Sequence, residues 1–96
     1  MTPFLPLGTI ITLQGSDAKL MITGRLQRHS ATGQVYDYCA CLWPQGYLDA
    51  SSNYLFDHDQ VDRLFYIGMQ DEEEFNFRFR LEEAEKALHR GMQVEE

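Results

Sequence analysis

The chain has 96 residues, of which 44% are hydrophobic, and its formal net charge is −7, from 15 acidic and 8 basic residues. This length suits one domain with one core, and the hydrophobic fraction excludes an intrinsically disordered chain, which combines low hydrophobicity with high net charge. The acidity disfavours binding to nucleic-acid phosphates or anionic membranes and favours a basic protein partner.

The first residues, Met1 to Pro6, contain neither a basic region nor a long apolar run. They do not match a secretory signal peptide, and no apolar stretch in the chain approaches the roughly 20 residues of a membrane-spanning helix. The two cysteines are separated by one residue, which does not suggest a disulfide framework and agrees with a reducing compartment. We therefore expect a cytoplasmic protein.

The first half of the chain predicts three strands separated by turn signals. These strands are expected at residues 8–13, 20–26 and 35–43. Gly, Ser and Asp at 14–19 favour a tight turn between the first two strands, and Gly24 is a candidate bulge in the second. A polar loop at 28–34 precedes the third strand, and Pro44-Gln45-Gly46 ends it.

The middle of the chain predicts one short helical turn and a last strand. Asp57 is followed three residues later by Gln60, which is a capping-box pattern. This pattern predicts the helical turn within 57–62, because Asp57 can accept hydrogen bonds from the free amides at its start. Residues 63–68 then predict a strand that a glycine closes.

The carboxy-terminal part changes character and predicts a helix over 71–91. Its acidic run comes before the Lys and Arg residues, which is the charge order that a helix dipole favours. Apolar residues recur at three- and four-residue intervals and predict a stripe that packs on the sheet. The stripe consists of Phe75, Phe77, Phe79, Leu81, Ala84 and Leu88. Glu82 and Lys86 form a favourable i, i+4 pair, and Gly91 is a plausible stop.

The segment 75–81 also alternates with period two, so its apolar residues could line one face of a strand. We favour a helix because the residues that follow are strong helix formers. Strands followed by a helix predict one α+β domain over 1–96, mainly β at 1–68. The expected architecture is a strongly bent antiparallel sheet, in its most specific form a small SH3-like barrel, with the carboxy-terminal helix packed on it.

Two clusters of potential ligands have simpler explanations. Cys39 and Cys41 share one face of the third strand, but the further Cys or His ligands of a zinc site are missing, and a redox motif would separate the two by two residues. We expect both to be small core residues. Asp57, His58 and Asp59 lack the ligand spacing of a calcium loop. We therefore expect neither a metal nor another cofactor.

The sequence also contains no catalytic motif. The serines lie in predicted loops outside any nucleophile-elbow pattern, and no phosphate-cradling glycine loop occurs. A domain of this size offers little volume for a ligand cleft of about 300 Å³ or more. We therefore expect no enzymatic activity.

The surplus of aromatic residues predicts an interaction surface. A small domain cannot bury all of these rings, and exposed Tyr and Trp are enriched in protein-binding hot spots. Alternatively the rings complete the core or its rim, and the sequence leaves both roles open. The acidic run is either the solvated start of the helix or a docking patch for a basic partner. The candidate partner-binding residues are Tyr36, Tyr38, Trp43, Tyr47, Tyr54, Asp71, Glu72, Glu73 and Glu74.

Five segments follow one another in a recognisable order: LPLGTIITLQG, KLMITGRLQ, YDYCACLWPQGYL, NYLFDHDQVDRLFYIG and DEEEF. Together they resemble the domain-of-unknown-function 4176 family over about residues 5–75. That family combines an LPIGSVV-type opening, a K-x-x-M-I-x-G-R segment and a YDY-x-x-C-x-Y-P-x-G block. Trp43 stands where the family usually has tyrosine or phenylalanine.

Members of that family are small cytosolic proteins of Gram-positive bacteria, often encoded near type VII (ESX-like) secretion genes and their toxins. The resemblance implies an accessory role, such as an adaptor or chaperone that binds a secretion substrate or component. As an alternative it implies an immunity protein that neutralises a cognate toxin, and it assigns no catalytic residue. A small-ligand-binding domain is a third hypothesis, and the sequence leaves open whether the chain forms a homodimer.

Overall fold

The computed structural model describes the backbone of residues 3–95 and the side chains of residues 3–88. Five strands precede one long helix, which confirms the α+β class. The strands are β1 (Ile10–Leu13), β2 (Leu20–Arg28), β3 (Val35–Leu42), β4 (Tyr54–Phe56) and β5 (Val61–Tyr66). The helix is α1 (Glu72–Glu95), and two 3-10 turns, η1 (Ala50–Ser52) and η2 (His58–Gln60), lie in the connections.

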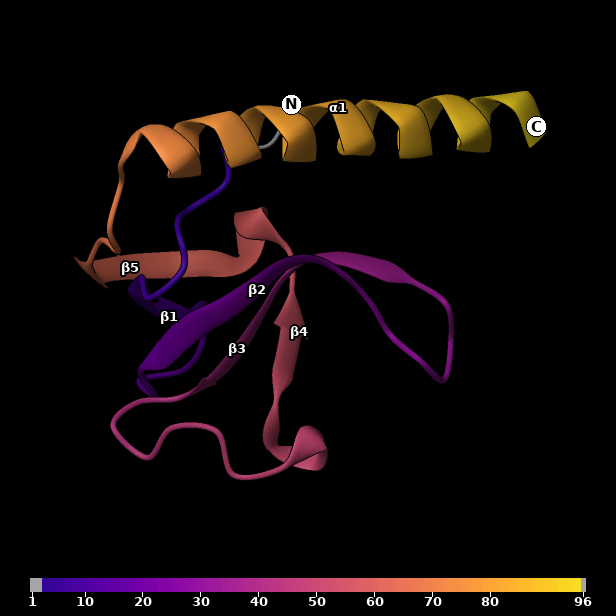
Figure 1. Ribbon diagram of the computed structural model, residues 1–96. Helices are drawn as coiled ribbons and strands as arrows, with labels where there is room; N and C mark the ends of the chain where they lie inside the picture. Colours follow the sequence, from indigo (N-terminus) through magenta and orange to yellow (C-terminus); the bar gives the residue numbers. More distant parts are fainter. Residues whose placement is uncertain (1–2, 96) are drawn as a thin grey trace.

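The strands form one antiparallel sheet in the order β4-β3-β2-β1-β5 (Figure 1). Within residues 3–95 no pairing joins β4 to β5, so the sheet is open and the expected barrel does not close. The register of β2 against β3 shifts between Ile22 and Gly24, which confirms the predicted bulge. A Cβ at Gly24 would lie 2.8 Å from the Sγ of Cys39, so glycine leaves room for that thiol.

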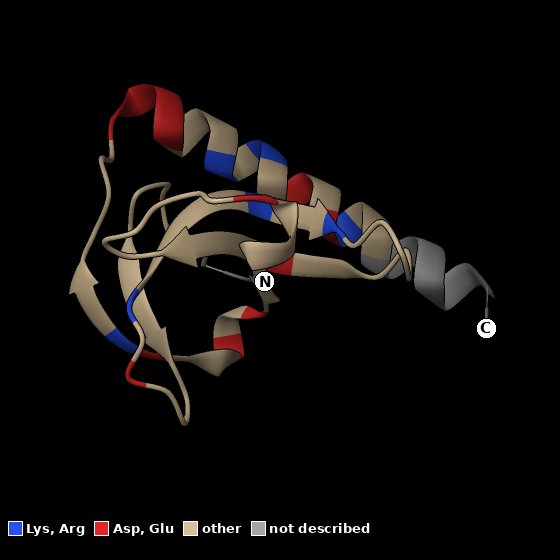
Figure 2. Ribbon diagram, turned by 90° about the horizontal axis from the view of Figure 1, so that it is seen from below, with Lys and Arg blue, Asp and Glu red and all other residues tan. Residues whose placement is uncertain are grey.

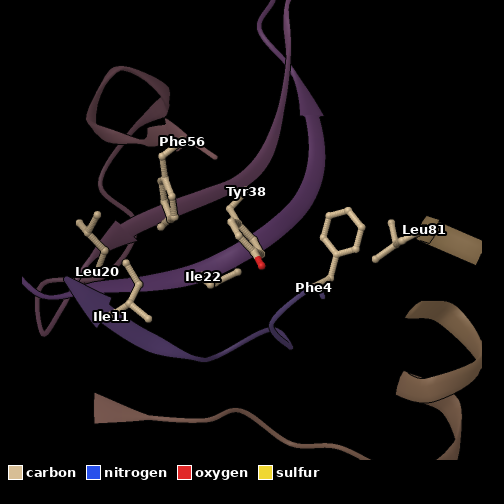
Figure 3. Packing of buried hydrophobic residues seen from close by; sticks show 8 residues of the cluster. Phe4, Ile11, Leu20, Ile22, Tyr38, Phe56 and Leu81 are labelled. Carbon is tan, nitrogen blue, oxygen red and sulfur yellow. The ribbon is translucent and has the colours of Figure 1, made fainter. Parts of the chain in front are cut away.

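The core lies between one face of the sheet and α1. Its buried side chains are Phe4, Ile11, Leu20, Ile22, Tyr38, Ala40, Phe56 and Leu81. Figure 3 shows Phe4 between Tyr38 and Leu81, so the segment before β1 forms a partial layer between the sheet and the helix. Burial of these apolar side chains stabilises the arrangement by roughly 1.5–3 kcal/mol for each large one.

The predicted packing of the phenylalanine stripe is wrong. Phe75, Phe77 and Phe79 are 52%, 49% and 64% exposed, whereas Leu81 is 7% exposed. The helix buries Leu81 and Glu85 instead, and the side chain of Glu74, which is 11% exposed, lies on the same side of the helix. Because successive residues are turned by about 100°, burial of this side directs Phe75 and Phe79 away from the core.

The limits of α1 also differ from those predicted. The helix begins at Glu72 and continues through Gly91 to Glu95, so Gly91 does not end it. Lys86 pairs with Glu83 at 3.6 Å rather than with Glu82. None of the helical segments between residues 3 and 95 is both long and apolar enough to cross a membrane.

The connection from β5 to α1 packs against the segment that precedes β1. The amide of Gly68 donates a hydrogen bond to Thr9 Oγ1 at 3.0 Å. A Cβ at Gly68 would overlap the carbonyl oxygen of Leu7, so only glycine fits at this position. This close approach sets where the chain leaves the sheet and where α1 begins.

Candidate interaction surfaces

The predicted partner-binding residues do not form one surface. Trp43, Tyr47 and Tyr54 lie in the β3–β4 connection and on edge strand β4, at the end of the molecule away from α1 (Figure 1). Tyr36 is half-buried near the opposite end of β3. An extended strand rises about 3.3 Å per residue, which separates Tyr36 from Trp43 by roughly 20 Å.

Four apolar side chains make up what we call the distal aromatic surface: Trp43, Tyr47, Leu48 and Tyr54. Their exposed fractions are 47%, 63%, 62% and 41%. The Trp43 amide donates to the carbonyl oxygen of Lys19 at 2.9 Å, and Gly46 turns back to Leu42 through a 2.7 Å hydrogen bond. Gly46 has a φ of +83°, which suits glycine in such a turn. Backbone hydrogen bonds therefore hold the turn that carries Trp43.

Tyr38 is a core residue, which corrects its predicted place on the partner surface. Its ring packs against Phe4, Phe56 and His58, with centroid distances of 6.1, 5.5 and 5.7 Å. Its hydroxyl accepts a 2.9 Å hydrogen bond from the Leu5 amide and lies 2.6 Å from His58 Nδ1. Because the Leu5 amide is a donor, the hydroxyl is free to donate to Nδ1. Burial raises the pKa of Tyr38 to about 12, so the hydroxyl keeps this proton.

A polar network continues from Tyr38 along the edge of the sheet. Asp37 Oδ2 accepts from the His58 amide at 2.9 Å, and Asp57 Oδ1 accepts from the Asp37 amide at 3.1 Å. Asp57 and Gln60 form the predicted capping box at the start of η2. These contacts join β3 to η2, so the Asp57-His58-Asp59 segment has a role in the fold.

The surroundings of Asp37 disfavour the ionised form of its carboxyl group. Burial raises its pKa, the hydrogen bond from the His58 amide opposes this, and the charges of Asp57 and Glu85 raise the pKa further. In the folded state Asp37 therefore binds a proton more tightly than in the unfolded chain. Protonated Asp37 therefore contributes stability that is fully present below pH 3.8 and is lost as the pH rises through the higher pKa of the folded state.

We expect Asp37→Asn to be neutral or stabilising at pH 7, by less than about 1 kcal/mol because solvent screens this site. The amide oxygen of Asn can still accept from the His58 amide, while the buried charge is gone. Urea unfolding of both proteins at pH 4 and pH 7 measures the effect, with exposed Asp62→Asn as the control. A loss above about 1 kcal/mol at pH 7 would show that the ionised carboxylate stabilises the network.

The acidic run is only partly available to a partner. Asp71 Oδ1 accepts from the Glu74 amide at 2.8 Å and so begins the helix. Glu74 Oε1 accepts from Arg25 Nη2 at 2.9 Å, and Arg78 Nη2 lies 3.0 Å from Glu74 Oε2. Glu72 and Glu73 remain exposed at the acidic start of α1, which precedes its basic residues in Figure 2. Asp71 and Glu74 thus have structural roles at the start of the helix, and docking of a basic partner on the acidic run stays a prediction.

Glu74 occupies the most buried ion pair among the described residues. The side chains of Arg25 and Glu74 are 3% and 11% exposed. Burial by itself would raise the pKa of Glu74, but the hydrogen bonds and charges of Arg25 and Arg78 outweigh it and lower the pKa. Arg25 also donates to the Leu5 carbonyl oxygen at 3.3 Å and lies over the Phe77 ring. The pair therefore fastens the first turn of α1 to β2.

Of the two cysteines that were expected in the core, only Cys41 is fully buried. Cys41 is buried, Cys39 is half-buried, and neither forms a disulfide. Across the part of the chain that the structure describes, no three His, Cys, Asp or Glu side chains converge as metal ligands would.

An open groove separates α1 from the β2–β3 hairpin. Its lining residues are Leu26, Arg28, Val35, Ala84, Ala87 and Leu88, and its volume is about 400 Å³. Ligand clefts start at about 300 Å³, so the expectation that the domain is too small for such a volume is wrong. Leu26 has a φ of +50°, a conformation that is strained for a bulky side chain.

The sequence did not predict a further set of exposed apolar side chains. They lie on β5, in the β5–α1 connection and on α1. These side chains are Leu64, Tyr66, Ile67, Met69, Phe75 and Phe79. The signal in the sequence is the unbroken apolar run at 64–67, which lacks the polar alternation of a strand with one wet face.

The comparisons with known proteins identify a family. Residues 4–77 match the family model described as a domain of unknown function (DUF4176). The chain therefore belongs to this family, as the resemblance of its five segments predicted. The matched region contains the whole sheet, the Tyr38 network and the Arg25–Glu74 pair. No curated protein and no solved structure gives a significant match.

Proposed function

We propose that this chain is a non-catalytic protein-binding domain whose distal aromatic surface contacts a protein partner. One observation carries the proposal: Trp43, Tyr47, Leu48 and Tyr54 are all exposed, and all come from the β3–β4 connection and the start of β4, at the end of the molecule away from α1 (Figure 1). Keeping large apolar side chains in water forgoes the free energy of their burial. Trp and Tyr are also the residue types that dominate binding hot spots.

The support beneath Trp43 favours binding. Its backbone is held by the Lys19 carbonyl, and the turn behind it is closed by the Leu42–Gly46 bridge. A side chain on a preorganised backbone loses less conformational entropy when a partner docks than one on a flexible loop. Trp43 is therefore the residue of this surface that we expect to contribute most.

The net charge of −7 makes a basic partner surface complementary to this chain and would accelerate its association. In the setting that the family resemblance implies, the partner is a type VII secretion substrate or component. The chain would then act in the cytoplasm as an adaptor or chaperone.

Trp43→Ala tests the proposal. We expect it to weaken partner binding by at least about 30-fold, which corresponds to a hot spot of about 2 kcal/mol. The variant should stay folded and lose no more than about 2 kcal/mol of unfolding free energy, because only about half of the side chain is buried. The measurement is co-expression of the tagged chain with each neighbouring secretion protein, followed by titration calorimetry on the pairs that co-purify. Phe79→Ala, an exposed aromatic on another face, is the matched control.

Three other results would favour a different surface or a different function. Equal binding by wild type and Trp43→Ala would remove the distal aromatic surface from the proposal. Rescue of cells from a neighbouring toxin by this chain would instead identify an immunity protein. A thermal shift of several degrees with a metabolite, and with no protein partner, would favour a ligand-binding domain that uses the groove beside α1.

A further inference from the structure

We infer that the groove between α1 and the β2–β3 hairpin binds a straight-chain aliphatic carboxylate. The inference goes beyond the proposed function, because this groove lies apart from the distal aromatic surface and holds a small molecule rather than a protein. Three observations support it: the apolar lining of the groove, the arginine beside that lining, and the backbone conformation of Leu26.

The groove exists because α1 continues past the core of the domain. Leu81 is the helical member of the core cluster. Ala84 and Leu88 lie about one and two turns further along the same side of the helix, where they line the groove together with residues of the hairpin. Figure 1 shows this hairpin beneath the later turns of α1. Because an alanine side chain is only a methyl group, Ala84 and Ala87 leave open the space that longer side chains would fill.

The lining of the groove favours an alkyl chain. Apart from Arg28 it is apolar, and the volume of about 400 Å³ lies within the range of small-ligand clefts, which starts at about 300 Å³. Its apolar members are Leu26, Val35, Ala84, Ala87 and Leu88. Covering such side chains with an alkyl chain removes apolar surface of both from water, which is favourable. No aromatic ring is among the described lining residues, so the lining offers a flat aromatic ligand nothing to stack on.

Arg28 supplies the charge that selects a carboxylate. None of the described lining residues is acidic, although the chain has 15 acidic residues. Arg28 Nη1 donates to the Gly33 carbonyl oxygen at 2.8 Å, which holds the side chain on the hairpin. Within residues 3–88 Arg28 takes part in no ion pair, whereas Arg25 and Arg78 are paired with Glu74. A guanidinium has five N–H donors in a fork that fits a carboxylate, so Arg28 retains donors for a ligand.

The backbone of Leu26 is a third and independent observation. Its φ of +50° is a value that bulky residues rarely adopt, and within the described chain the other residues with positive φ are glycines. The side chain of Leu26 packs against the core cluster and lines the groove. Backbone outliers of this kind are concentrated at ligand-binding and active sites. The strained position of the strand therefore coincides with the groove.

The apolar and charged parts of the site are neighbours. Val35 and Arg28 are directly paired across the hairpin, and Leu26 lies two residues before Arg28. In the bound state the alkyl chain lies between the hairpin and α1, and the carboxylate accepts hydrogen bonds from Arg28. Both parts of the ligand are therefore needed: an alcohol with the same chain lacks the charge, and acetate lacks the chain.

Titration of the wild-type chain with octanoate, kept below the concentration at which it forms micelles, tests the inference. By calorimetry we expect a Kd of about 1 mM or lower. In magnetic resonance spectra the amide signals that move should centre on Leu26, Val35 and Ala84. Acetate, octanol and octylammonium should each bind at least about fivefold more weakly, because they lack the chain, lack the charge or carry the opposite charge.

Variants separate the two parts of the site. Arg28→Gln should weaken octanoate binding by at least about fivefold and leave octanol binding unchanged. Ala84→Phe should weaken octanoate binding by at least about tenfold, because the added ring occupies the groove. Arg63→Gln and Ala50→Phe make the same kinds of change at exposed positions outside the groove and should bind as the wild type does. Trp43→Ala should also bind octanoate normally, so the proposed function and this inference can fail separately. Circular dichroism confirms that each variant is folded.

Failure of octanoate to bind would overturn the inference. Equal binding of octanoate and any of the three comparison probes would overturn it too, as would unchanged octanoate binding in either Arg28→Gln or Ala84→Phe. Amide shifts centred on Trp43 and Tyr54 would place the alkyl chain on the distal aromatic surface and so contradict the groove. Shifts at Leu26 and Ala84 that follow protein concentration, with no response to octanoate, would identify a second copy as the occupant instead.

Discussion

Glu74→Gln is expected to lower the free energy of unfolding by about 3–5 kcal/mol, because it leaves a buried guanidinium without its carboxylate. Arg25 is 7% exposed as a residue, and its Nη2 donates to Glu74 Oε1 at 2.9 Å. The desolvation of Arg25 is offset by this pair, so the loss of one partner costs more than the pair itself contributes. Urea unfolding at pH 7, followed by the fluorescence of Trp43, measures the change.

Two matched variants give this prediction its control. Glu73→Gln changes the exposed neighbouring carboxylate and should alter stability by no more than about 0.5 kcal/mol. The double variant Arg25→Met with Glu74→Leu removes both charges and should recover much of the loss. If Glu74→Gln leaves the domain unfolded, folding of the double variant still decides the question. Equal effects of Glu74→Gln and Glu73→Gln would contradict the role of the pair.

The Arg25–Glu74 ion pair also makes the stability of the domain depend on pH in the acid range. The pKa of Glu74 is lower in the folded chain than its ordinary value of 4.5. The stability that the ionised carboxylate contributes is therefore fully present above pH 4.5 and is lost as the pH falls through the lower folded value. Glu74→Gln should flatten this part of the pH profile, and Glu73→Gln should not.

The Arg25–Glu74 pair also explains where prediction from the sequence failed. The helix itself is readable from local periodicity and from the acidic residues at its start. Which side of the helix faces the sheet is decided by Arg25, 49 positions from Glu74 in the chain. Apolar periodicity points to the phenylalanines, and the ion pair turns Phe75 and Phe79 outward instead. Long-range polar contacts of this kind leave no local pattern.

Local features were predicted more successfully than surfaces. The Gly24 bulge and the Asp57–Gln60 capping box depend on residues close in sequence or on the conformational freedom of glycine, and both are confirmed. The exposed edge of β5 depends on strand order, which no single segment encodes. Alternation along β3 groups Tyr36 with Tyr38, but only the packing of Phe4 and the position of His58 show that Tyr38 lies in the core.

Tyr38→Ala is expected to cost about 3–5 kcal/mol, the usual loss when a large core ring is truncated. Tyr38 is fully buried and contacts Phe4, Phe56 and His58, so its removal leaves a cavity at the junction of the sheet, the segment before β1 and η2. Denaturant unfolding of this variant measures the whole contribution of the side chain.

Tyr38→Phe separates the hydroxyl from the ring. It keeps the ring contacts but leaves the Leu5 amide and His58 Nδ1 without the hydroxyl between them. A buried group that loses its partner costs about 1–3 kcal/mol, so this variant should fall between wild type and Tyr38→Ala. Tyr36→Phe, a half-buried tyrosine on the same strand, should change stability by less than about 0.5 kcal/mol. Equal stability of Tyr38→Phe and wild type would mean that packing alone holds Tyr38, and the bond to His58 would then add nothing to the contact between β3 and η2.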